Sequence, residues 1–64
     1  MIQTFKTDLE KASFVLNVKY DTPSEEVGGM LYIDVTERLS VAIDRAQIED
    51  LAEEYDEYIR ELNQ

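Results

Sequence analysis

The segment that decides the fold is DRAQIEDLAEEYDEYIREL, residues 44–62. Its apolar residues recur every three or four positions, which is the spacing of one face of an α-helix. The residues of this stripe are Ile48, Leu51, Ala52, Tyr55, Ile59 and Leu62. Asp44 is a good N-cap with Gln47 three residues later, and no Pro or Gly follows from Arg45 to the C-terminus. The segment therefore predicts a long amphipathic helix.

Three stretches before this helix alternate between apolar and polar residues, as strands with one buried face do. They are residues 13–20, residues 30–35 and residues 39–43. Residues 36–38 between the last two have the length of a hairpin loop. We expect an antiparallel sheet of three strands, whose apolar face is covered by the C-terminal helix. The predicted residues of that face are Phe14, Leu16, Val18, Leu31, Ile33, Val35, Leu39, Val41 and Ile43.

A short helix is expected before the first strand, because four apolar residues there follow helical spacing. These residues are Ile2, Phe5, Leu9 and Ala12. After the first strand, Thr22, Pro23 and Glu25 match a capping box, and Gly28-Gly29 would end the resulting turn and lead into the next strand. The predicted order is α-β-β-β-α, a single small acidic α+β domain over residues 1–64.

Composition excludes several classes of site. The chain has no His and no Cys, so zinc fingers, Cys–His nucleophile pairs and histidine pH switches are ruled out. Its acidic residues lack the spacing of an EF-hand, and carboxylates on an outward helix face lack the pocket that would separate their pKa values. We expect a protein that is not an enzyme and that has no cofactor and no metal site. The hydrophobic content of 44% is too high for a disordered acidic tail.

The charge balance favours basic partners. Fifteen acidic residues against six basic ones give a formal net charge of −9. Direct binding to nucleic acid or to an anionic membrane would therefore meet repulsion. Residues 30–33 form the longest apolar run, far short of the roughly 20 residues that span a bilayer. Residues 1–6 do not resemble a signal peptide, so the cytoplasm is the expected compartment.

The acidic residues concentrate on the predicted C-terminal helix. Seven acids and one base, Arg60, lie between Glu49 and Glu61, over a rise of about 18 Å. At 100° per residue, four acids face away from the apolar stripe: Asp50, Glu53, Glu57 and Glu61. Three others flank the stripe, namely Glu49, Glu54 and Asp56, and Tyr58 borders it as a candidate anchor for a contact. One carboxylate per roughly 2.6 Å lies between the phosphate spacings of single-stranded and duplex DNA, about 3.4 and 1.7 Å.

Two interpretations of this surface stay open. A run of charges is most often a solvated face, and acids near a helix N-terminus favour the helix dipole. Like charges three or four residues apart cost about 0.2–0.5 kcal/mol per pair, however, which a purely solvated face could avoid by mixing signs. On the functional interpretation, the acidic helix binds a basic protein groove in place of nucleic acid.

In size, charge and lack of Cys, the chain resembles virus-encoded inhibitors that occupy nucleic-acid sites on DNA glycosylases, restriction enzymes or CRISPR nucleases. The resemblance implies a nucleic-acid mimic whose partner is a nucleic-acid-binding enzyme and whose association is steered and salt-sensitive. An antitoxin-like or immunity-like partner of a single basic protein would use the same surface.

The sheet face opposite the C-terminal helix is a second candidate interface. Its partly apolar residues are predicted to be Val15, Met30, Tyr32 and Ala42. One helix cannot cover both faces of a sheet, so either the N-terminal helix packs on this face or a partner does. The alternative function is thus a structural or adaptor module that forms a homodimer through this face, with the acidic helix serving only solubility.

Overall fold

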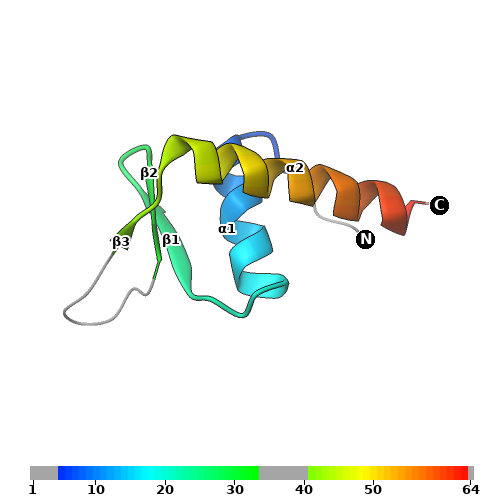
Figure 1. The fold of residues 1–64 in the computed structure, drawn as a ribbon, viewed down its shortest axis with the longest axis horizontal. Coiled ribbons are helices and arrows are strands. Elements are labelled where there is room, and N and C mark those ends of the chain that lie inside the picture. The colour runs from blue at the N-terminus through cyan, green and yellow to red at the C-terminus, as the bar shows by residue number, and fades with distance from the viewer. Residues whose placement is uncertain (1–4, 34–40, 64) are drawn as a thin grey trace.

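The computed structural model describes residues 5–33 and 41–63. Two helices flank three short strands in chain order (Figure 1): α1 (Asp8–Val18), β1 (Ser24–Val27), β2 (Met30–Ile33), β3 (Val41–Ala42) and α2 (Arg45–Leu62). The strands form one antiparallel sheet in the order β1-β2-β3. The predicted α+β class and the order α-β-β-β-α are confirmed.

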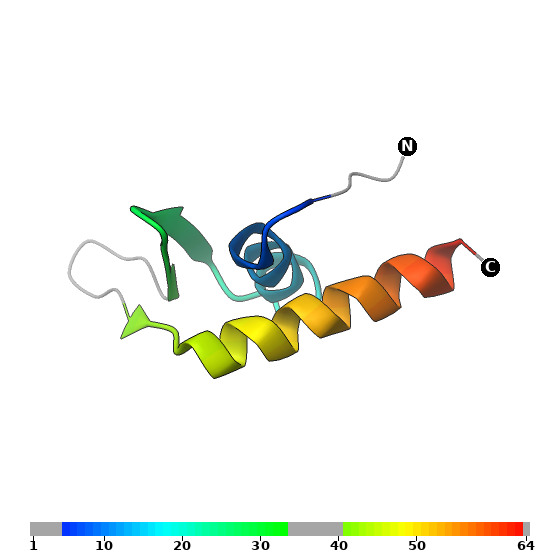
Figure 2. The same ribbon diagram turned by 90° about the horizontal axis from the view of Figure 1, so that it is seen from above.

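Helix α1 occupies the centre of the molecule. It lies between the sheet and α2 (Figure 2) and runs across α2 rather than along it (Figure 1). The apolar stripe of α2 therefore packs mainly on α1, and only the first turns of α2 approach the sheet. The C-terminal turns of α2 extend beyond α1, which contributes to an elongated shape of 41 × 20 × 16 Å.

The buried core draws on all three layers. Ala12 and Val15 come from α1, Leu31 from β2, and Ala52 and Tyr55 from α2. Two of these residues are alanines, one on each helix. The small side chains of Ala12 and Ala52 allow the backbones of α1 and α2 to approach closely. The large side chains of Tyr55 and Leu31 fill the rest of the core.

The predicted strand over residues 13–20 is wrong. Residues 13–18 belong to α1, which begins after the N-cap Thr7. The Thr7 Oγ1 accepts a hydrogen bond from the Glu10 N–H at 3.2 Å and donates one to the Glu10 carboxylate at 2.8 Å. This local Thr7–Glu10 pair marks the start of a helix. Because α1 packs on two sides, its apolar residues surround much of the helix, and they fit an alternating pattern as well as a helical one.

The stripe expected for the N-terminal helix also needs a correction. Leu9 and Ala12 do lie on α1, but Phe5 precedes its first residue, Asp8. Ile2 falls outside the described residues. The N-terminal helix thus exists, but it starts later and extends further than its predicted stripe.

The predicted capping box at residues 22–25 does not form a helical turn, because Ser24 and Glu25 belong to β1. The chain leaves α1 through Asp21, whose φ of 52° is in the left-handed region. Ser24 is then held by α1, since its N–H donates to the Asn17 Oδ1 at 3.2 Å. Pairing with β2 and this hydrogen bond outweigh the local preference for a helix start.

The turn at Gly28-Gly29 is confirmed. Both glycines have positive φ, 60° and 82°, and they join Val27 to its cross-strand partner Met30. A two-residue hairpin loop with positive φ at both positions is a type I′ turn, which glycine adopts without strain.

The predicted alternation along β2 is confirmed at Met30 and Leu31, whereas Tyr32 and Ile33 are both half-buried. Leu31 is buried, whereas Met30 is exposed on the other face and accepts a weak hydrogen bond from the Tyr32 hydroxyl at its sulfur, 3.7 Å away. Tyr32 lies opposite Ala42 on β3. The loop expected at residues 36–38 lies outside the described residues, as do Val35 and Leu39.

Candidate functional site

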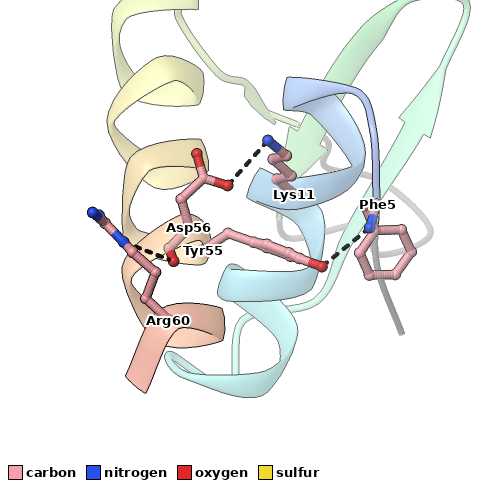
Figure 3. Close-up of polar contacts among 5 residues, drawn as sticks. All are labelled: Phe5, Lys11, Tyr55, Asp56 and Arg60. Carbon is pink, nitrogen blue, oxygen red and sulfur yellow. Dashed lines mark hydrogen bonds and ion pairs between the residues drawn. The ribbon is translucent and has the colours of Figure 1, made fainter. Parts of the chain in front are cut away.

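The orientation of α2 is set by Tyr55, whose side chain is 1% exposed. Its ring meets the Phe14 ring edge-on, with centroids 5.5 Å apart and an interplanar angle of 87°. The ring of Phe5 lies 5.8 Å from it on another side. The Tyr55 hydroxyl accepts a hydrogen bond from the Phe5 N–H at 3.1 Å (Figure 3). Rotating α2 about its axis would break these contacts, so the opposite side of the helix faces outward.

Two of the predicted partner-binding acids contact α1 or the turn after it. The Asp56 carboxylate lies 3.1 Å from the Lys11 ammonium (Figure 3). The Glu54 carboxylate lies 3.6 Å from the Lys19 ammonium and accepts hydrogen bonds from the Tyr20 hydroxyl at 2.9 and 3.0 Å. These acids connect α2 to both ends of α1, which gives them a structural role within the chain.

The contact between Tyr20 and Glu54 has an electrostatic consequence. The hydrogen bond to the Glu54 carboxylate raises the pKa of the Tyr20 phenol above its ordinary value. Partial desolvation and the negative charge of Glu54 act in the same direction, and the nearby Lys19 ammonium acts against them. A hydroxyl with a raised pKa stays protonated at neutral pH, so it serves here as a hydrogen-bond donor.

The remaining predicted acids of α2 are exposed, and four of them lie on its outward side. All of these side chains are exposed to solvent: Glu49, Asp50, Glu53, Glu57 and Glu61. The ion pairs found among residues 5–33 and 41–63 involve only Glu54 and Asp56 of this helix. Helix α2 thus combines a packed side, two tethering acids and a row of solvent-facing carboxylates.

A groove of about 350 Å³ lies between α1 and α2. Its lining includes Phe14, Val15 and Val18 from α1, and Tyr58 from α2. Four charged side chains complete it: Lys19, Glu54, Glu57 and Glu61. Sequence reasoning placed Tyr58 at the edge of the stripe but missed the groove, because it assigned the α1 residues to a strand beneath the helix.

The predicted sheet-face interface is smaller than expected. Val15 is 3% exposed and belongs to α1, so it cannot contribute to an exposed sheet face. Met30 is 47% exposed, Ala42 is exposed and Tyr32 is half-buried. The candidate patch therefore reduces to Met30, Tyr32 and Ala42.

In the described part of the chain, no group of three or more acidic side chains is arranged to hold a metal ion. Neither α1 nor α2 is both long and apolar enough to cross a bilayer.

No protein-family model matches this chain, and no curated protein or solved structure matches it significantly.

Proposed function

We propose that this chain is a non-enzymatic inhibitor that binds a basic protein surface through α2, in place of nucleic acid. The observation that carries the proposal is the row of exposed carboxylates on the outward side of α2: Asp50, Glu53, Glu57 and Glu61. This row extends over about 16 Å at 1.5 Å per residue. The expected target is the nucleic-acid groove of an enzyme such as a DNA glycosylase, a restriction enzyme or a CRISPR nuclease.

The packing of α2 against α1 supports this proposal. The Tyr55 contacts and the tethers at Glu54 and Asp56 hold the helix against α1. A charged row on a fixed helix needs little ordering when a partner binds, and preorganisation of this kind lowers the cost of association. Complementary charge also speeds encounter with a basic groove.

Charge reversal on α2 tests whether binding depends on the row of carboxylates or only on the net charge of the chain. The double variant Glu53→Lys, Glu57→Lys changes the net charge from −9 to −5, because each substitution adds two units to the starting value. The control Glu25→Lys, Glu26→Lys makes the same change on exposed residues of β1. Tagged proteins are incubated with bacterial lysate at low salt and eluted with salt, and separately with duplex DNA.

We expect the wild-type chain and the β1 control to retain a nucleic-acid enzyme that duplex DNA displaces, and the α2 variant to lose it. Far-UV circular dichroism establishes that each variant is folded. Equal retention by all three proteins contradicts the proposal, and equal loss in both variants shows that only total charge matters.

Self-association through the sheet face is the second candidate function. It is favoured by the exposure of Met30 and by the position of Tyr32 opposite Ala42 on one face. A wild-type chain that stays monomeric while it binds the basic enzyme argues against this alternative.

A further inference from the structure

We infer that the groove between α1 and α2 is the anchor point for a protein segment that carries an apolar side chain flanked by arginine or lysine. The inference rests on the proposed function, because it assigns the basic partner to one particular part of the α2 surface.

The apolar part of the groove is built from both helices. Val18 on α1 is 58% exposed and Tyr58 on α2 is 39% exposed, and both line the same hollow. Phe14 lies between the core and this surface, with its ring 6.0 Å from that of Tyr58 and 5.5 Å from that of Tyr55. The groove is near the lower end of the roughly 300–1,000 Å³ range of ligand pockets, which suits one or two side chains.

The acidic part of the groove already holds one cation. Glu54, Glu57 and Glu61 follow one another at spacings of three and four and all line the groove. Glu57 and Glu61 therefore belong both to the outward row and to the edge of the groove. The first position is taken by the chain's own Lys19, 3.6 Å from Glu54. Within the described ranges, Glu57 and Glu61 have no basic side chain in ion-pair contact. The Lys19–Glu54 pair therefore shows which kind of group the two open positions would accept.

Charge complementarity selects a basic segment over a second copy of this chain. Two copies meeting at this groove would bring Glu57 and Glu61 close to their counterparts, and like charges at an interface are strongly unfavourable. A basic side chain would satisfy the acids instead, while its aliphatic stem covers Val18 and its cationic head approaches the Tyr58 ring. Arginine suits this site best, because its planar guanidinium both stacks on aromatic rings and pairs with carboxylates.

Two synthetic peptides of equal length and equal positive charge test the inference. One combines arginine with leucine on a single helical face, and the other replaces each leucine by serine. Affinities are measured by calorimetry, and the binding site is mapped by amide chemical shifts of the ¹⁵N-labelled chain. We expect the leucine peptide to bind roughly 10-fold tighter or more, since burial of one leucine contributes that much. The largest shifts should fall at Val18, Lys19 and Tyr58.

Matched variants separate the groove from general surface effects. Val18→Ser should remove most of the difference in affinity between the leucine peptide and the serine peptide. Val27→Ser should not, because Val27 has a similar exposure, 54%, but lies at the hairpin on β1. Glu57→Gln with Glu61→Gln should weaken both peptides more than Glu25→Gln with Glu26→Gln, which makes the same change in charge.

Three outcomes would overturn the inference. Equal affinity for the two peptides, with shifts at Asp50 and Glu53 but not at Val18 or Tyr58, rejects the groove and leaves the proposed function standing. Failure of both peptides to bind at low salt rejects the groove and the proposed function together. Shifts at the groove that depend on protein concentration without peptide identify a second copy as the occupant.

Discussion

The two helices of this domain differ in how many sides they pack. Helix α1 lies between the sheet and α2, and its polar residues Ser13 and Asn17 hydrogen-bond to Ser24 at the start of β1. Helix α2 packs on one side, and four of its carboxylates face outward. A helix packed on two sides has little surface left for partners, whereas a helix packed on one side can carry charge without disturbing the core.

The largest expected effect comes from removing the side chain that joins the helices. Tyr55→Ala should lower the free energy of unfolding by about 3–5 kcal/mol, as large aromatic-to-alanine changes in cores do. A domain of this size has only a few kcal/mol of stability, so the variant should be largely unfolded. Urea denaturation followed by circular dichroism measures the change.

Tyr58→Ala is the matched control, because it removes the same side chain from the same helix at an exposed position. Tyr58→Ala should lower the free energy of unfolding clearly less than Tyr55→Ala does. Equal losses in the two variants would contradict the view that the helices are joined chiefly through Tyr55.

A smaller effect is expected where α1 holds α2 by charge. Lys11→Met keeps most of the aliphatic stem but removes the ion pair with Asp56, and should lower the free energy of unfolding by about 0.2–1 kcal/mol. The difference from wild type should shrink as salt is added. A double-mutant cycle with Asp56→Asn isolates the pair, and a coupling energy near zero in low salt would show that the contact adds no stability.

The smallest expected effect concerns the other tether, between Tyr20 and Glu54. Because the pKa of Tyr20 is raised in the folded chain, this contact stabilises the fold below the unfolded-state pKa of the phenol. The contribution is lost as the pH rises through the folded-state pKa. Glu54→Gln should lower the pKa of Tyr20, measured from its ring resonances during an alkaline titration.

Glu53→Gln serves as the control for this titration, since Glu53 is exposed and neighbours Glu54 in sequence. It should leave the pKa of Tyr20 nearly unchanged. The same pKa in the wild-type chain and in Glu54→Gln would mean that the hydrogen bond does not persist in solution.

Helix α2 could be predicted in detail from the sequence because the spacing of its apolar residues is compatible with only one type of secondary structure. Its apolar stripe fits only a helical period, and the acids predicted to face outward are exposed. The turn at Gly28-Gly29 could also be predicted from local sequence, because glycine readily adopts the positive φ that both positions have.

Helix α1 could not be predicted in the same way. Its segment SFVLNV, residues 13–18, contains aromatic and β-branched residues that favour strands in isolation. Contacts on two sides override that preference, and they also move Val15 from a predicted interface into the core. The groove beside Val18 depends on where α1 crosses α2, so no local pattern could reveal it.

The sequence by itself thus predicted the α-β-β-β-α order, although it placed the first strand on residues of α1, and it determined the long acidic helix and the side of that helix that faces solvent. Periodicity and residue type are local properties of the sequence. When a helix packs on one side only, its apolar stripe shows which side is buried. Tertiary structure alone decided which segment forms the central helix, which acids are tethered by Lys11 and Lys19, and where the groove forms. These features depend on contacts between residues that are distant in the chain, and burial on two sides removes the amphipathic signal that a sequence would otherwise display.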